Sequence, residues 1–225
     1  MMAVVMAGSM VMLAGCASSP KQAREETDVI QAWASRRPPV ETVVSSIKSA
    51  ELATMVNTFA PIPGNIYKMT AEMVDKEAVL DRGRKIHQAF MTDVAATAVD
   101  GKSKADAVKE IKAKLTPEQA DMIGKYEAAT IKKDLGIVLK KLAEMGVEIA
   151  NAGTQAAGLT KALKDSQEFR QLAGLQAIMA GKAITSDVGK LQKQIGATTE
   201  GIGLLKQLAE TDKNAQAYMK DYPIQ

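Results

Sequence analysis

The feature that most constrains the fold of this chain is a run of apolar or small residues at alternating spacings of three and four. The run begins at Ala128 and ends at Leu163. Such spacing places one apolar face along about five heptads of an α-helix and is typical of a coiled-coil seam. The members of this first seam are Ala128, Ile131, Leu135, Val138, Leu142, Met145, Ile149, Ala152, Ala156, Leu159 and Leu163. The run therefore predicts a long helix that buries one side.

The sequence around the first seam indicates where this helix begins and ends. Thr116-Pro117-Glu118-Gln119 has the order of a capping residue, a proline at the first helical position and a glutamine that closes a capping box. We expect one rod of about 70 Å from Pro117 to Lys164, at about 1.5 Å per residue.

A second seam follows the first after Asp165 and Ser166. It repeats the alternation of three and four, and its members are Ile184, Val188, Leu191, Ile195, Thr198, Ile202, Leu205 and Ala209. Because the apolar phase between Phe169 and Met179 differs from the phase that begins at Ile184, we expect a kink or break near residues 181–186. Two seams in succession predict an antiparallel hairpin.

Shorter helices are predicted before the hairpin, separated by prolines and by an Asp-Gly pair. Aromatic residues are 4% of the chain, and strands draw on aromatic and β-branched side chains. The fold is therefore predicted to be all-α: an elongated helical bundle with a long antiparallel coiled-coil hairpin, divided into N-terminal helices (20–115) and the hairpin (116–225). The expected helices are Ser19 to Arg36, Val40 to Phe59, Asn65 to Val99 and Ser103 to Leu115.

The first fifteen residues are uncharged and apolar or small, as in the hydrophobic region of an export signal. They end in Leu13-Ala14-Gly15-Cys16, which resembles the lipobox of bacterial lipoproteins. The resemblance implies a cleaved signal peptide at 1–15 and an anchor and tether at 16–19. It also implies acyl chains, a diacylglycerol among them, on Cys16, and two or more chains anchor a protein stably in a membrane.

Two residue choices near the lipobox carry further expectations. In Gram-negative lipoproteins a residue other than Asp after the cysteine, here Ala17, implies sorting to the outer membrane, so we expect a protein that faces the periplasm. No Lys or Arg precedes the apolar stretch, although an export signal begins with one, which predicts a start codon upstream of Met1.

The sequence contains no motif that predicts a catalytic, cofactor-binding or metal site. Cys16 is the only cysteine and His87 the only histidine, and no Glu-x-x-His, Cys-x-x-Cys-His, Gly-x-Ser-x-Gly, Walker or dinucleotide-binding motif is present. We expect His87 to be a buried or boundary polar group on the third helix. A net charge of +3 without a basic run interleaved with aromatics argues against nucleic-acid binding.

Three further features have a structural and a functional interpretation. Glycines one place after seam positions favour either close helix approach or ordinary Ala/Gly-rich composition. Lysines along Ser103 to Leu115 indicate a solvated face rather than an anion contact. We expect Trp33 to pack onto the body rather than at a membrane interface. The glycines are Gly146, Gly153, Gly189, Gly196 and Gly203, and the lysines are Lys102, Lys104, Lys109, Lys112 and Lys114.

These patterns together predict a non-catalytic protein. We interpret the chain as a lipid-anchored envelope protein whose helical body serves as a scaffold or interaction subunit, with a protein partner or self-association through the seams. One alternative is a membrane-active helical protein, although charges between Lys161 and Arg170 at the hairpin tip argue against insertion. The other alternative is a bundle that binds a small ligand, which a pocket lined by convergent polar groups would favour.

Overall fold

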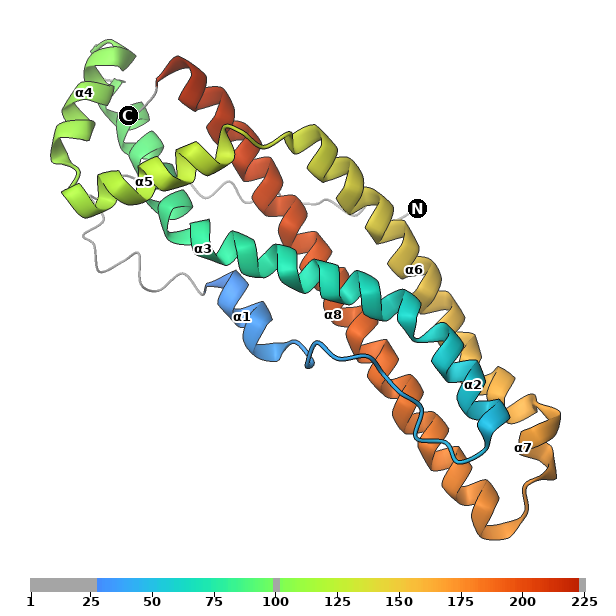
Figure 1. Cartoon of the computed structure of the whole chain (residues 1–225). Helices are drawn as coiled ribbons and strands as arrows, with labels where there is room; N and C mark the ends of the chain where they lie inside the picture. Colours follow the sequence, from blue (N-terminus) through green and yellow to red (C-terminus); the bar gives the residue numbers. More distant parts are fainter. Residues whose placement is uncertain (1–27, 99–101, 223–225) are drawn as a thin grey trace, which may run out of the picture.

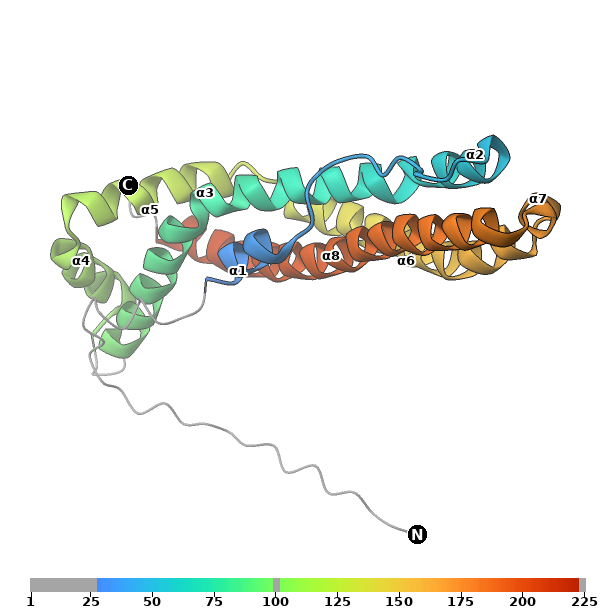
Figure 2. The same cartoon turned by 90° about the horizontal axis from the view of Figure 1, so that it is seen from below.

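The structure, a computed structural model, describes residues 28–98 and 102–222 of the chain. Within these residues eight α-helices form an elongated bundle without a strand, which confirms the predicted all-α class (Figure 1). Figures 1 and 2 show α4 and α5 at one end of the bundle and α7 at the other. The helices are α1 (Val29–Arg36), α2 (Ala50–Phe59), α3 (Pro61–Ala98), α4 (Lys104–Lys114), α5 (Pro117–Thr130), α6 (Leu135–Asp165), α7 (Gln167–Gln171) and α8 (Gly174–Asp221).

The predicted antiparallel hairpin is formed by α6 and α8, which lie side by side with α7 between them at the turn (Figure 1). The seam residues that α6 contributes are buried, apart from the half-buried Val138 and Leu159. Those of α8 are also buried except Ile195, which is half-buried. The two seams therefore face each other within one chain, because each offers an apolar stripe of the same period.

The first rod is shorter than predicted. Residues 131–134 separate α5 from α6, and Asp134 caps α6 by accepting a hydrogen bond from the N–H of Ile137 at 3.1 Å. Ala128 and Ile131, which match the seam spacing, are exposed. The predicted single helix from Pro117 to Lys164 is therefore wrong, since a local aspartate cap begins a new helix inside the apolar pattern.

The break in the second rod also lies elsewhere. Residues 181–186, where a kink was predicted, are inside the continuous helix α8. The chain instead bends at Leu172 and Ala173, and Gly174 has a φ of +54°, a conformation that glycine adopts without strain. Ser166 caps α7, because its hydroxyl accepts a hydrogen bond from the N–H of Phe169 at 3.2 Å.

The helices before the hairpin agree with prediction at their ends more than at their starts. The start predicted at Ser19 lies outside the described residues, but the predicted helix through residue 28 is wrong because Asp28 is extended and caps α1. The end at Arg36 is confirmed. In α3 the helix begins at Pro61, four residues before the predicted Asn65, since proline fits the first turn of a helix.

The chain between α1 and α2, residues 37–49, is not helical and is called the strap below. A helix was predicted from Val40, but Val40 and Val44 are 45% and 67% exposed, and α2 begins only after its cap Ser49. Asp187 of α8 holds the strap, because it accepts hydrogen bonds from the N–H of Ser46 at 2.7 Å and from the Ser46 hydroxyl at 2.9 Å. These hydrogen bonds replace those that a helix would form.

The fourth and fifth helices begin as predicted. Ser103 caps α4, and Thr116 and Gln119 form the reciprocal capping box of α5. Both helices pack on α3, where Phe90 and Val94 form an apolar cluster with residues of α4 and α5.

Among the glycines of the described residues, the two with the closest neighbours are ones that the seam spacing did not single out. A Cβ at Gly83 would lie 2.5 Å from the backbone oxygen of Met122, and one at Gly201 would lie 2.6 Å from Cγ2 of Thr70. The glycines that follow the α8 seam, Gly189, Gly196 and Gly203, have no such neighbour within 4 Å. Close approach within the chain therefore explains Gly83 and Gly201, not these three.

Candidate functional site: a buried charge network

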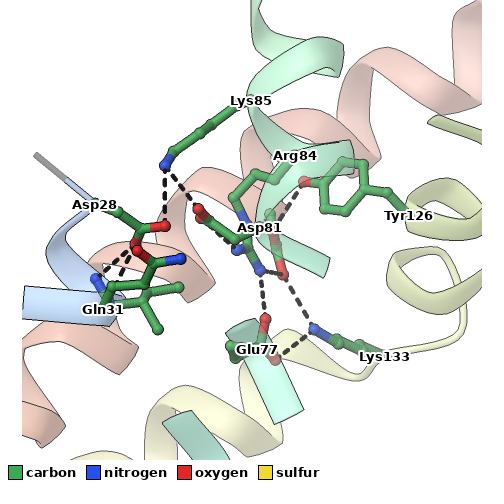
Figure 3. A network of polar contacts seen from close by, with 10 residues as sticks. Asp28, Gln31, Glu77, Asp81, Arg84, Lys85, Tyr126 and Lys133 are labelled. Atoms are coloured by element: carbon green, nitrogen blue, oxygen red, sulfur yellow. Dashed lines mark hydrogen bonds and ion pairs between the residues drawn. The ribbon is translucent and has the colours of Figure 1, made fainter. Parts of the chain in front are cut away.

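Oppositely charged side chains of α3 and α8 meet in the interior of the bundle (Figure 3). Arg84 of α3 is 2% exposed and Asp212 of α8 is 1% exposed. The Arg84 Nε–H donates a hydrogen bond to Asp212 Oδ1 at 2.8 Å. Such burial of charge destabilises a protein unless every charged group has a partner. The neighbours of this pair therefore determine whether it stabilises the fold.

Three neighbours complete the centre of the network. Glu77, about two turns before Arg84 on the same face of α3, accepts a hydrogen bond from Arg84 Nη2. Lys133, in the α5–α6 connection, lies with Nζ 2.7 Å from Glu77 Oε1 and 3.2 Å from Asp212 Oδ2. The Tyr126 hydroxyl of α5 donates a hydrogen bond to Asp212 Oδ1 at 2.8 Å. Asp212 therefore accepts from donors on α3, α5 and the connection between α5 and α6.

The network extends to the start of α1. Asp81 Oδ1 lies 3.5 Å from Arg84 Nη1, and its other oxygen lies 2.8 Å from Lys85 Nζ. Lys85 Nζ is also 3.7 Å from Asp28, the residue that caps α1 (Figure 3). The ion pairs thereby link α1 to the centre of the bundle.

The surroundings hold the central groups in one charge state each. Burial alone would raise the pKa of Asp212, but the Arg84 hydrogen bond and charge and the Lys133 charge outweigh it and lower that pKa. Burial opposes the charge of Arg84, yet Asp212 and Glu77 raise its pKa. Burial, followed by the charge of Asp212, raises the pKa of Tyr126 well above its usual value. Asp212 is thus a carboxylate already occupied by donors, which suits a structural cross-link rather than a general base.

His87 lies next to this network and is fully buried. This agrees with the prediction from the sequence that it is a buried or boundary polar group. Its Nε2 is 3.6 Å from Glu127 Oε1, and its ring lies between those of Tyr126 and Tyr218 at centroid distances of 5.5 and 6.0 Å. Burial lowers the His87 pKa to about 4, against a smaller opposing effect of Asp212. His87 is therefore a neutral imidazole at pH 7.

Other residues singled out from the sequence have structural surroundings. Trp33 is 3% exposed, and its Nε1–H donates to the carbonyl of Ala197 at 2.9 Å, so its packing onto the body is confirmed. On the lysine-rich α4 region, Lys102 and Lys114 pair with Glu110 at 2.7 and 2.8 Å. Cys16, the predicted lipidation site, lies outside the described residues.

Two absences hold within the described ranges, 28–98 and 102–222. No group of three or more His, Cys, Asp or Glu side chains is arranged to hold a metal ion. No helix there has both the length and the apolarity needed to cross a bilayer.

Sequence reasoning missed the charge network, although one signal pointed to it. The α8 seam was traced as far as Ala209, and the next position of its spacing, three residues later, is Asp212. A carboxylate at a seam position must find a partner when the seam is buried. Its partners come from α3, α5 and the α5–α6 connection, and no local spacing relates those residues to Asp212.

Comparison with known proteins adds no relative. No protein-family model, no curated protein and no solved structure matches the chain.

Proposed function

We propose that this chain is a lipoprotein of the bacterial cell envelope whose helical body is a non-catalytic scaffold or interaction subunit. Acyl chains on Cys16 hold it on a membrane, with the outer membrane and a periplasm-facing body as the preferred location. The observation that carries the proposal is Leu13-Ala14-Gly15-Cys16 directly after an uncharged apolar stretch. An acyl anchor also suits a body in which no described helix has the length and apolarity to span a bilayer.

The charge network supports the scaffold role. Its best-placed carboxylate, Asp212, is 1% exposed and accepts from Arg84 and Tyr126, both at 2.8 Å. A catalytic carboxylate needs a free lone pair that faces a substrate, and here the lone pairs are used inside the protein. The charged groups of the network therefore favour a role in holding the helices together over a role in catalysis.

The arrangement of the seams suggests where a partner binds. In α6 and α8 the seam residues are buried against each other. A partner would have to separate the two helices to reach them, at a cost of about 1.5–3 kcal/mol for each large apolar side chain exposed. We therefore place the proposed partner contact on the outer surface of the bundle.

Membrane fractionation of cells that express the full chain tests the anchor. Wild type should be found in the outer-membrane fraction as a processed, acylated protein. Cys16→Ser should remain unprocessed or appear in the soluble fraction, because serine offers no thiol for the diacylglycerol. Ala17→Asp should move the processed protein to the inner membrane. Ser18→Ala, a neighbouring change outside the lipobox, should behave as wild type.

The anchor proposal fails if Cys16→Ser is processed and sediments with membranes as wild type does. Mass spectrometry of the N-terminal peptide gives an independent measurement, since it detects the acyl chains directly.

A further inference from the structure

An open groove of about 860 Å³ lies between the strap and the outer face of α8. The strap runs from the end of α1 across α8 to α2, as the blue trace in Figure 1 shows. The groove extends along α8 from Lys190 to Glu200. Ten helical residues correspond to about 15 Å, and an extended peptide covers that length with four or five residues at about 3.3 Å each.

Hydrogen bonds from α1 and the strap to α8 hold both walls of the groove in place. Gln194 Nε2 donates to the carbonyl of Glu41 at 2.8 Å. Trp33 donates to the carbonyl of Ala197 at 2.9 Å, and Asp187 binds the strap at Ser46. Because these bonds already order the walls, a ligand would lose little free energy in arranging them.

Several polar groups along the groove have no partner. Gln194 is 3% exposed, and its Oε1 accepts no hydrogen bond in the described structure. Arg37 Nη1 is a buried donor, and it donates no hydrogen bond in the described structure. In the strap, the N–H groups of Thr42, Val43 and Val44 donate no hydrogen bond within the described residues. A buried polar atom without a partner costs about 1–3 kcal/mol, so a ligand that pairs with the Gln194 or Arg37 atom gains that free energy. Thr42 and Val44 are exposed, so their N–H groups offer donors without that gain.

The charge of the lining is positive. Four cationic and two anionic side chains line the groove, and neither Lys190 nor Lys193 forms an ion pair within the part of the chain that the structure describes. The two lysines are three residues apart on α8 and so lie on one helical face. The charged lining residues are Arg36, Arg37, Lys190, Lys193, Glu41 and Glu200.

Gly196 leaves the floor of the groove open. A Cβ built on this residue meets no atom within 4 Å. Gly196 costs about 1 kcal/mol relative to alanine inside a helix, and no close approach within the chain compensates for it. Room for the main chain of a ligand is a reason for glycine at this position.

We propose that this groove binds an extended, acidic peptide segment of a partner protein. The segment lies along the strap, and its peptide carbonyls accept hydrogen bonds from strap N–H groups. Its carboxylates lie near Lys190 and Lys193. This proposal rests on the interaction role proposed above and names the partner's chemistry.

A peptide fits the groove better than a small anion for two reasons. The cations are spread along about 15 Å of groove rather than converging on one point. The unused strap groups are backbone donors of a non-helical segment, and such donors pair with the carbonyls of a peptide main chain.

The test uses the protein as purified from the expressing cells, in detergent micelles, and a fluorescein-labelled hexapeptide of alternating Asp and Val. Fluorescence anisotropy measures binding, and emission from Trp33, the only tryptophan of the chain, reports whether the peptide occupies the groove. We expect saturable binding that changes the Trp33 emission and weakens with added salt. A hexapeptide with Lys in place of Asp should bind at least tenfold more weakly.

A pair of glycine variants gives the matched control. Gly196→Leu fills the floor of the groove and should weaken the peptide at least tenfold. Gly203→Leu, one heptad further along α8 and equally free of neighbours within 4 Å, lies outside the groove and should leave binding unchanged. Both changes remove an exposed helical glycine, so both variants should stay folded.

Four results would overturn the proposal. These are no binding of the Asp-Val peptide by wild type, equal binding of the Lys-Val peptide, equal binding by Gly196→Leu, or displacement of the peptide by sodium glutarate at the same carboxylate concentration. The last result would mean a small-anion site. None of them bears on fractionation of Cys16→Ser, so failure of the groove and failure of the anchor are distinguishable.

Discussion

Removing either member of the Arg84–Asp212 pair, which joins α3 to α8, should destabilise the protein far more than removing a member of an exposed ion pair between α3 and α5. Arg84 and Asp212 are 2% and 1% exposed, whereas the side chains of Arg82 and Glu118, 3.2 Å apart, are 71% and 66% exposed. Loss of one partner of a buried pair leaves an uncompensated charge and typically costs about 3–5 kcal/mol. An exposed pair contributes about 0–1 kcal/mol.

The structure narrows this range for each variant. Arg84→Met leaves Asp212 with Lys133 and Tyr126, and Asp212→Asn leaves Arg84 with Glu77, so each single variant keeps part of its compensation. We expect each to cost about 3 kcal/mol, the lower end of the range for a broken buried pair. Met and Asn keep most of the original volume, so cavity formation contributes little.

A double-mutant cycle measures the coupling. Urea unfolding followed by far-ultraviolet circular dichroism gives the free energy of unfolding of wild type, the two single variants and the double variant. The double variant should be more stable than the sum of the single effects predicts, by about 1 kcal/mol or more. Arg82→Ala is the control and should cost within about 0.5 kcal/mol. Additive effects, or an Arg82→Ala as costly as Arg84→Met, would refute this account of the network.

Two further predictions concern the seam and the buried histidine. Leu142→Ala, at a residue 0% exposed, should cost about 2–5 kcal/mol in urea unfolding, whereas Lys140→Ala on the outer face should cost within about 0.5 kcal/mol; equal unfolding midpoints would mean that the seam is not a core. Because the folded pKa of His87, about 4, is lower than its unfolded value near 6.5, the unfolded chain binds more protons between these values. The contribution of neutral His87 to the free energy of unfolding should be complete above pH 6.5 and fall by about 3 kcal/mol as the pH drops to 4. His87→Phe should reduce this loss when the free energy of unfolding is measured at pH 7 and at pH 4.5. An unchanged pH dependence in His87→Phe would contradict the prediction.

The seams were predictable because burial along a helix repeats with the period of the helix. Leu142, Ile149 and Leu191 occupy seam positions and are at most 1% exposed. Helix starts were predictable where the N-terminal cap is a local motif, as at Thr116 and Ser103. These features depend on residues within a few turns of one another, so the sequence alone contains the information.

The strap and the charge network were not predictable by the same means. Residues 40–49 have a helical apolar spacing, but Ser46 binds Asp187, which lies 141 positions further along the chain. Arg84 and Asp212 are separated by 128 positions. Such pairings depend on which helices become neighbours, and tertiary contacts override local propensity.

The position of the charge network suggests how the bundle keeps its register. A seam with a heptad repeat is self-similar, so a slide of α8 by seven residues would preserve much of its apolar contact. The same slide would move Asp212 by about 10 Å along the helix, far from Arg84, and would leave buried charges unpaired. Since an unpaired buried charge costs about 3–5 kcal/mol, we expect the network to select one register among those that the seam alone allows. The strap adds a second constraint of the same kind, because Asp187 and Gln194 meet their strap partners only in that register.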